Sequence, residues 1–288
     1  MKPSNTQKLL DRLKSLQPGA VALSGGVDST LLLSLCRKVW EKPPLAFTFL
    51  SPLLTAEERE RVRDLSRLMG ARLLWVKTRE YLEPNFKKNS PRRCYYCKKS
   101  RLVQAKGILK KEGVSFLLDG TNADDVKTYR PGIKAAQEEK IISPLALEGW
   151  SKADIRALSR DLNLPTWNLP ASPCLASRVA YGQPITLPLL RRLYLGEKAL
   201  LQMGFSQCRL RYHGPVVRIE VPAKEQFLLL QEQRKGEILD RLSDLGFTYV
   251  TLDLKGFRSG SLDEVLNPQK ITGFSISSQS RKESSGIS

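Results

Sequence analysis

The sequence predicts an α/β fold with a doubly wound parallel sheet, followed by a smaller α+β domain. First, short apolar segments alternate with amphipathic helical segments over roughly the first 180 residues. Second, residues 20–23 are wholly apolar, which is typical of a strand covered on both faces of its sheet. Third, the alternation changes near residue 182, where a long helical segment precedes closely spaced strands.

Each expected element follows from its apolar pattern and its flanking residues. In the first domain we expect strands at residues 20–23, 45–50, 73–76 and 116–118, and helices at 5–16, 55–69, 98–112 and 151–162. In the second domain we expect a helix at 187–203, strands at 208–212, 216–221 and 248–253, and a helical stretch at 224–245. The predicted domains are therefore 1–180 and 181–274, and the serine-rich tail at 275–288 is expected to be disordered.

Basic residues outnumber acidic ones, 47 to 29, and the net charge is +18. This excess favours anionic partners such as nucleotides, phosphorylated substrates or nucleic acid, but does not distinguish among them. The chain has no apolar run of the roughly 18 residues that a membrane-spanning helix needs. Its N-terminus lacks the apolar stretch of a secretion signal, so we expect a cytoplasmic protein without membrane association.

Residues 24–29, with the sequence Ser-Gly-Gly-Val-Asp-Ser, predict a phosphate-binding loop between a buried strand and a helix. The two glycines, Gly25 and Gly26, allow a sharp turn and close approach to a phosphate. Ser24 and Ser29 add hydroxyl donors, and the following helix supplies free N–H groups. The fifth residue, Asp28, is expected either to orient Mg²⁺ or to cap the helix.

Residues 119–125, with the sequence Asp-Gly-Thr-Asn-Ala-Asp-Asp, directly follow the predicted strand at 116–118. Ligands of open α/β sheets bind beyond the carboxyl ends of the strands, so Gly120 and Thr121 are expected beside the nucleotide. The carboxylates of Asp124 and Asp125 are candidates for holding Mg²⁺ through water. The alternative is a turn and helix cap without a metal.

The chain has five cysteines and one histidine, His213. One histidine excludes a His-rich metal site and makes a Ser–His–Asp triad an unsuitable explanation of the chemistry. A reducing compartment disfavours structural disulfides, so metal or reactive-thiol roles gain weight. We interpret Cys36 and Cys208 as structural residues.

The remaining cysteines, Cys94, Cys97 and Cys174, are candidate iron ligands. Three thiolates without a fourth ligand suggest a [4Fe–4S] cluster with one open iron. Basic residues surround the Cys-x-x-Cys pair, and we expect their field to lower the pKa of the thiols. A rival interpretation is RNA contact, with Tyr95 and Tyr96 as stacking faces.

With these motifs in place, the chain closely resembles one family of the PP-loop superfamily, whose fold is adenine nucleotide alpha hydrolase-like. That family is the LarE-type pyridinium-3,5-bisthiocarboxylic acid mononucleotide synthases. The resemblance rests on the two motifs above, on the segment Tyr-Arg-Pro-Gly and on Ser-Pro-Cys-Leu-Ala-Ser-Arg around Cys174. It continues into the second domain, and the matching segments occupy residues 24–29, 119–125, 129–132, 172–178, 209–213, 218–221 and 253–260.

The resemblance implies an ATP-dependent sulfurtransferase that serves the nickel-pincer nucleotide cofactor of lactate racemase. A carboxylate of pyridinium-3,5-biscarboxylic acid mononucleotide attacks the α-phosphate of Mg-ATP, and pyrophosphate leaves. Sulfur then displaces AMP, which gives a thiocarboxylate. The sulfur comes either from the cysteine that matches Cys174, which is consumed, or from a cluster; the presence of Cys94 and Cys97 favours the cluster.

The resemblance also implies roles for residues around this cysteine and in the second domain. Ser177 and Arg178 would shape the pocket of the cysteine, while Glu197 and Glu220 would support catalysis. The candidates for binding the substrate phosphate are Arg209, Arg211 and Arg258. The implied cofactors are ATP, Mg²⁺ and a [4Fe–4S] cluster, and the implied assembly is a homo-oligomer that does not require nucleic acid.

Other functions share parts of this pattern. A PP-loop tRNA thiolation enzyme would use the basic surface to bind RNA, with strongly salt-dependent affinity. An ammonia-dependent ligase of the NAD or GMP synthetase type would share the phosphate loop but would not need Cys174. An RNA-binding module that retains the nucleotide fold without activity would release no pyrophosphate.

Overall fold

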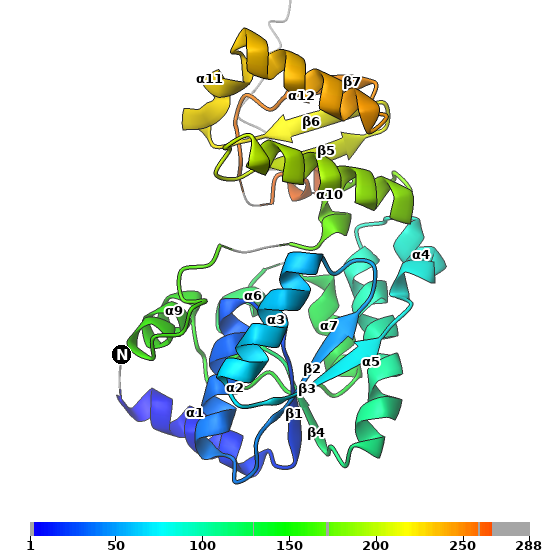
Figure 1. Cartoon of the computed structure of the whole chain (residues 1–288). Coiled ribbons are helices and arrows are strands. Elements are labelled where there is room, and N and C mark those ends of the chain that lie inside the picture. Colours follow the sequence, from blue (N-terminus) through cyan, green and yellow to red (C-terminus); the bar gives the residue numbers. More distant parts are fainter. Residues whose placement is uncertain (1–2, 129, 171–172, 259, 267–288) are drawn as a thin grey trace, which may run out of the picture.

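The computed structural model describes residues 3–128, 130–170, 173–258 and 260–266, and it consists of a larger and a smaller domain (Figure 1). The larger domain contains a sheet of four strands, β1 (Gly19–Ala22), β2 (Leu45–Leu50), β3 (Arg72–Lys77) and β4 (Phe116–Leu118). The strand order is β3-β2-β1-β4, and every neighbouring pair is parallel. The predicted parallel α/β sheet is confirmed.

Helices cover both faces of this sheet. Neighbouring residues of a strand point to opposite faces, so successive residues of β1 pack against different helices. Val21 of β1 packs in the core cluster that contains the buried side chains of α2 (Val27–Val39) and α3 (Ala56–Leu68). Ala20 packs in another cluster, with Leu109 of α5 (Arg93–Lys111). The remaining helices of this domain are α1 (Pro3–Ser15), α4 (Pro84–Lys87), α6 (Ala123–Val126), α7 (Pro131–Glu138), α8 (Pro144–Leu147) and α9 (Lys152–Asp161).

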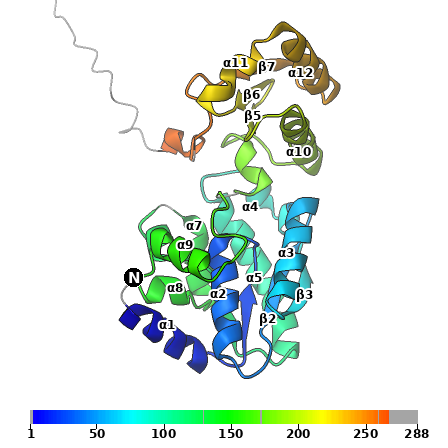
Figure 2. The same cartoon turned by 60° about the vertical axis from the view of Figure 1, so that its left-hand side comes forward.

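The smaller domain is a mixed sheet packed against helices (Figure 2). Its strands are β5 (Arg209–His213), β6 (Val216–Glu220) and β7 (Tyr249–Leu252); β5 and β6 are antiparallel, and β7 runs parallel to β6. Its helices are α10 (Leu187–Gln202), α11 (Gln226–Leu229) and α12 (Glu232–Asp244). The predicted α+β character is confirmed. The helical stretch expected at 224–245 is interrupted between α11 and α12.

One difference from the predicted elements lies at the start of α5. This helix begins at Arg93 rather than at residue 98, so Cys94 and Cys97 lie in its first turns. In the basic, proline-containing segment before residue 98, the apolar residues do not recur at the helical spacing that would predict a helix. Tertiary contacts order it instead, because the segment from Lys87 to Asn89 accepts backbone hydrogen bonds from Ile185 and Gly182.

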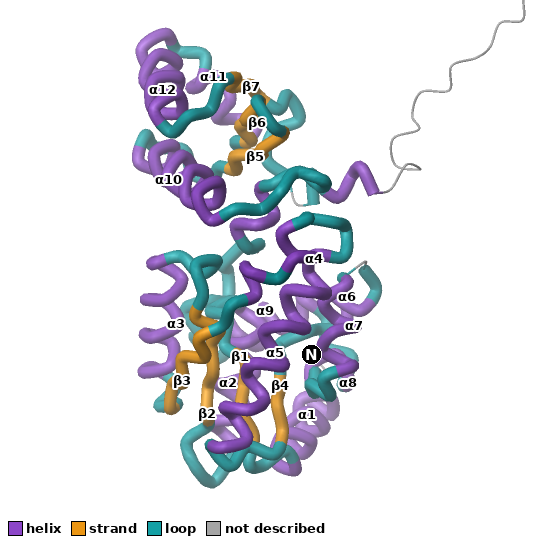
Figure 3. The backbone as a smooth tube through the Cα atoms, turned by 90° about the vertical axis from the view of Figure 1, so that its right-hand side faces the viewer, coloured by secondary structure: helices purple, strands orange, loops and turns teal. Residues whose placement is uncertain are grey.

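The carboxyl end of β2 leads into α3, whose first turn contacts the smaller domain, and α4 lies between the parallel sheet and the smaller domain (Figure 3). The domains contact each other directly, since the Tyr194 hydroxyl of α10 donates a hydrogen bond of 2.7 Å to Glu57 of α3. Within the described residues, no helix is long and apolar enough to cross a membrane. The tail predicted to be disordered at 275–288 lies outside the described residues, and the domain boundaries stay predictions.

The capping box of α3 gives a test of local helix stability. Thr55 accepts a hydrogen bond from the Glu58 backbone, and the Glu58 side chain accepts one from the Thr55 backbone. We expect Thr55→Ala to lower the free energy of unfolding by about 1 kcal/mol, because the first turn loses its side-chain acceptor. Urea denaturation measures the loss, and Glu60→Ala on the exposed face of α3 is the control. Equal stability of Thr55→Ala and the unchanged protein would contradict the assignment of this cap.

Candidate active site

The phosphate loop lies between β1 and α2, as the sequence predicts. Gly25 adopts a positive φ of 79°, a conformation that L side chains rarely adopt. The Ser24 and Ser29 hydroxyls lie 3.1 Å apart, and the Ser24 backbone N–H donates to the Ser29 Oγ at 3.2 Å. Gly26 is the N-cap of α2 without a side-chain cap, so the loop has the glycines, hydroxyls and helix N-terminus that a phosphate site requires.

The second motif, at 119–125, packs directly against this loop. A Cβ on Gly120 would lie 2.8 Å from the backbone nitrogen of Ser29 and 3.1 Å from the Cβ of Asp28, so only glycine fits there without displacement. The Asn122 amide donates to Asp28 at 3.2 Å. Thr121 follows in the same turn and donates its backbone N–H to Asp119. The structure therefore brings together Gly120, Thr121 and the phosphate loop.

The carboxylates of Asp124 and Asp125 form hydrogen bonds and an ion pair within the larger domain. Asp125 completes the capping box of α6 with Asn122 and forms an ion pair of 2.9 Å with Arg130. Asp124 accepts the backbone N–H of Lys152 at 2.8 Å. Among the residues described, no group of three or more His, Cys, Asp or Glu side chains is placed to hold a single metal ion. Magnesium binding by these carboxylates stays a prediction.

Two cations that the sequence analysis did not select lie beside the phosphate loop. Lys152, the first residue of α9, contacts Asp28 through Nζ at 2.6 Å. The Arg61 Nε lies 3.3 Å from the position that a Cβ of Gly25 would occupy, and this buried atom has no hydrogen-bond partner in the described part of the chain. A lysine at the start of a helix opposes the helix dipole, which is a signal that would have identified Lys152.

The buried Asp119 forms an ion pair with the partly buried Lys98 beside this site. Lys98 Nζ lies 2.7 Å from the Asp119 carboxylate, which also accepts the Ser143 hydroxyl at 2.6 Å. Burial raises the pKa of Asp119, but the Lys98 charge and the hydrogen bonds outweigh burial and leave that pKa below its ordinary value of 3.8. The carboxylate anchors the turn that carries Gly120.

The cysteine site combines the first turns of α5 with the loop before a 3-10 helix, Leu175–Arg178. Cys94 and Cys174 are exposed, Cys97 is half-buried, and each of the first two acts electrostatically on Cys97. Cys36 and Cys208 are buried elsewhere, as the sequence predicts.

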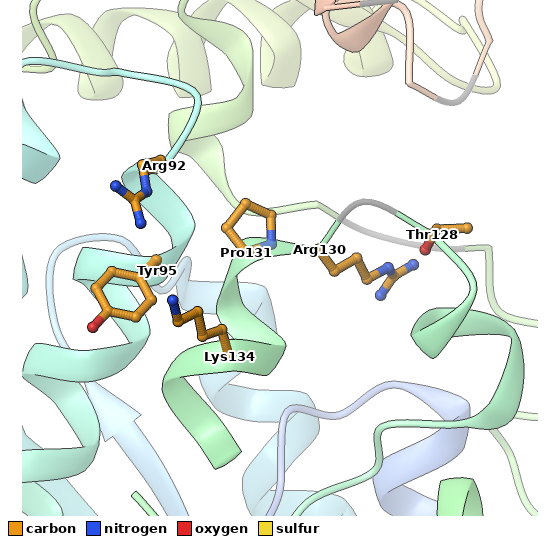
Figure 4. A pocket seen from close by; sticks show the side chains of 6 residues that line it. All are labelled: Arg92, Tyr95, Thr128, Arg130, Pro131 and Lys134. Atoms are coloured by element: carbon orange, nitrogen blue, oxygen red, sulfur yellow. The ribbon is translucent and has the colours of Figure 1, made fainter. Parts of the chain in front are cut away.

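The expected lowering of thiol pKa values is wrong for the Cys-x-x-Cys pair. Although the Cys94 residue as a whole is exposed, surrounding protein atoms desolvate its thiol and raise the pKa of Cys94. Desolvation also raises the pKa of Cys97 to about 12 despite the charge of Arg101. Three cations, Arg92, Arg130 and Lys134, line an open hollow of about 300 Å³, in which Arg130 extends away from Tyr95 (Figure 4).

Arg178 holds the backbone around Cys174. Its Nη1 donates to the carbonyls of Pro173 and Cys174, while Nε and Nη2 form a bidentate pair with Glu197 at 2.9 and 3.0 Å. Both side chains are buried. Glu197 also accepts the Leu210 backbone N–H. These contacts tie the loop to α10 and β5.

The other second-domain candidates form a neighbouring network. Arg211 pairs with Glu220 at 3.0 Å and donates to the Ser177 carbonyl at 2.8 Å. Arg258 pairs with Asp253 and Glu264. Arg209 lies over the Phe257 ring, at 5.2 Å from its centroid, and donates to the Cys208 carbonyl. Thus Arg211 and Glu220 join the cysteine loop, whereas Arg258 lies farther along the network.

Helix α5 connects the phosphate loop to the Cys-x-x-Cys pair. Cys94 and Cys97 lie in its first turns, and Lys98 of the same helix pairs at 2.7 Å with Asp119, whose turn carries Gly120 against the phosphate loop. Burial lowers the pKa of Arg178, but the charges of Glu197, Cys174 and Glu58 outweigh burial and leave that pKa above its ordinary value.

A parallel α/β sheet with this glycine loop and a neighbouring Asp-Gly-Thr-Asn turn defines a nucleotide-binding protein of the PP-loop class. Sequence comparison identifies the family. The chain is 36% identical over 270 residues to the pyridinium-3,5-bisthiocarboxylic acid mononucleotide synthase of Lactiplantibacillus plantarum, covering 92% of this chain and 96% of that protein. The chain belongs to this synthase family.

Two uncharacterised relatives have similar coverage. The protein slr1717 of Synechocystis is 38% identical over 92% of this chain and 99% of its own length. The protein MJ0830 of Methanocaldococcus jannaschii is 29% identical over 83% of this chain and 90% of its own length. No protein-family model matches the chain.

The ion pair of the buried Asp119 with Lys98 predicts a specific acid sensitivity. Because the folded pKa of Asp119 is depressed, its contribution to stability is present above the unfolded value of 3.8 and is lost as the pH falls through the folded pKa. In Lys98→Ala burial dominates, so that pKa rises and acid unfolding starts at a higher pH. We also expect a loss of about 1–3 kcal/mol at pH 7. Circular dichroism against pH measures both effects. In the control, Lys111→Ala, which changes an exposed lysine at the end of α5 without an ion pair among the described residues, acid unfolding should stay close to that of the unchanged protein.

Proposed function

We propose that this chain is an ATP-dependent sulfurtransferase that converts the carboxylates of pyridinium-3,5-biscarboxylic acid mononucleotide to thiocarboxylates. The product belongs to biosynthesis of the nickel-pincer nucleotide cofactor of lactate racemase. The observation that carries the proposal is that α5 joins the two motifs, because its first turns carry Cys94 and Cys97 and its Lys98 pairs at 2.7 Å with Asp119 of the turn that packs against the phosphate loop. The 36% identity to the named synthase over nearly the whole chain supports the same conclusion.

In the first step, the chain activates a carboxylate that is otherwise a poor acceptor for sulfur. The loop at 24–29 binds the pyrophosphate part of ATP, and Lys152 and Arg61 offset the charge of the leaving group. A carboxylate oxygen of the substrate bonds to the α-phosphorus, the bond to pyrophosphate breaks, and an acyl-adenylate forms. Asp28, Asp124 and Asp125 are the carboxylates available for Mg²⁺.

In the second step, sulfur bonds to the activated carbonyl carbon, and AMP leaves with the electron pair of the broken C–O bond. Cys174 lies at the centre of this step, and Arg178 holds its backbone against Glu197. Arg209, which has no carboxylate within ion-pair distance in the described ranges, is the most available of the three arginines for a substrate phosphate. Glu220 pairs with Arg211, and Arg211 donates a hydrogen bond to the Ser177 carbonyl of the cysteine loop.

The chemistry of the donors fits an iron–sulfur cluster held by Cys94, Cys97 and Cys174. Cys94 and Cys174 are exposed residues, the three thiols act on one another electrostatically, and a buried Nε of Arg93 beside them has no partner in the described part of the chain. Ligands of a cluster bind separate irons and need not surround one ion. A cluster with three cysteine ligands would supply an open iron and the sulfur for transfer.

A rival PP-loop function, thiolation of tRNA, would use the cationic hollow beside α5. Whole-length similarity to a synthase of a small nucleotide favours the mononucleotide substrate. A homo-oligomeric assembly remains a prediction from the family resemblance.

Replacement of Lys152 tests the nucleotide site. We expect Lys152→Gln to weaken binding of a non-hydrolysable ATP analogue about tenfold or more, because one charge-assisted contact to the phosphates is lost. Isothermal titration calorimetry gives the dissociation constant. Lys111→Gln, an exposed change at the end of α5, should bind normally. Equal affinity in both variants would exclude Lys152 from the phosphate site.

Replacement of Cys174 separates activation from sulfur transfer. We expect Cys174→Ala to form the adenylate and release pyrophosphate but to give no thiocarboxylate. Anaerobically prepared, unchanged protein should contain about four irons per chain with labile sulfide, and its mass should be unchanged after turnover. Cys36→Ala, a change in the core, should keep both iron and product. Loss of one H₂S from Cys174 during turnover would instead identify the sacrificial mechanism, and full thiolation by Cys174→Ala would refute the proposed role.

A further inference from the structure

Arg93 is a buried cation without an acidic partner. Three arginines are buried in the described ranges, Arg93, Arg178 and Arg211. Arg178 pairs with Glu197 at 2.9 Å, and Arg211 pairs with Glu220 at 3.0 Å. Arg93 is 4% exposed, yet no carboxylate of the described residues lies within ion-pair distance of it.

The contacts of the Arg93 guanidinium are neutral. Its Nη1 donates to the Asn89 Oδ1 at 2.6 Å and to the Val179 carbonyl at 3.3 Å. It lies over the Tyr181 ring at 4.6 Å from the centroid, and its Nε has no partner. Asp263 accepts the Tyr181 hydroxyl at 2.7 Å and makes no ion pair with Arg93. The charge is therefore held in place without being neutralised.

Asn89 fixes the position of this guanidinium. It is fully buried with a φ of 54°, and its amide donates to the carbonyls of Val179, Ala180 and Gln183. The same contacts join the start of α5 to the segment that follows Cys174. The arginine thus lies where the two parts of the cysteine site meet.

Burying a charge that no opposite charge offsets is unfavourable, so the retention of Arg93 here points to a compensating anion close to it. The charge of Arg93 acts on Cys94, the next residue. Arg101 also acts on Cys97, but Glu80 pairs with it at 2.6 Å and cancels most of its charge. Arg92 is exposed and screened by solvent.

We propose that Arg93 is the built-in counter-cation of the cysteine site, which offsets the negative charge of a thiolate-held iron–sulfur cluster. The proposal rests on the proposed function, because it assumes that Cys94, Cys97 and Cys174 hold the cluster. Arg93 touches no substrate and acts through these ligands, so it is a positioning residue.

The test uses the full chain, reconstituted anaerobically with iron and sulfide, as Arg93→Gln, Arg93→Lys and Arg92→Gln. A nearby cation stabilises the reduced, more negative state of a cluster. We therefore expect Arg93→Gln to shift the reduction potential to a more negative value and to lower the iron content at limiting iron. Arg93→Lys should keep most of both properties, and Arg92→Gln should match the unchanged protein. Spectroelectrochemistry and iron and sulfide analysis give the readouts.

The outcomes separate the two proposals. If the unchanged protein takes up no cluster, the cluster assignment fails and the role of Arg93 fails with it. If the unchanged protein loads normally and Arg93→Gln has the same potential and iron content, the role of Arg93 alone is refuted. Thermal unfolding reports whether Arg93→Gln is folded. If it is not, Arg93→Lys decides, because a charge-retaining variant with a shifted potential would overturn the proposal.

Discussion

The bidentate pair between Arg178 and Glu197 is the constraint on which the candidate active site depends. Both ions are buried, so neither tolerates loss of the other. The remaining donors of Arg178 bind the carbonyls of Pro173 and Cys174. Because Glu197 belongs to α10, the smaller domain fixes the backbone of a cysteine whose sulfur is exposed. Rigid support of an accessible nucleophile or ligand is what sulfur transfer requires.

A second buried ion pair in the smaller domain also supports the cysteine loop. Arg211 and Glu220 support Ser177 from the adjacent strands, and Ser261 donates to Glu220 at 2.7 Å. Paired charges give this network little net charge. Arg93, across the site on α5, is the exception among the buried arginines of the described ranges. The site thus combines neutralised charges for rigidity with one uncompensated charge beside the thiols.

The sequence by itself determined the sheet, the phosphate loop and the family. Those features follow from local rules: apolar runs for buried strands, glycines where the chain must turn, and a capping box at Thr55. The parallel order of strands follows because the segments between them are helical and long enough to cross over. The motif around Cys174 is also local, so its resemblance to the synthase family was visible before any contact was known.

Only the tertiary structure decided which charges act together. The start of α5 is helical because distant residues such as Gly182 bond to the segment before it, which no local pattern reports. The pKa values of Cys94 and Cys97 rise because burial outweighs a basic sequence context whose side chains partly face solvent. Arg61 and Arg93 became distinguishable from surface cations only in the folded chain, where a buried Nε of each has no hydrogen-bond partner among the described residues. Desolvation and pairing are properties of the folded chain, and composition does not contain them.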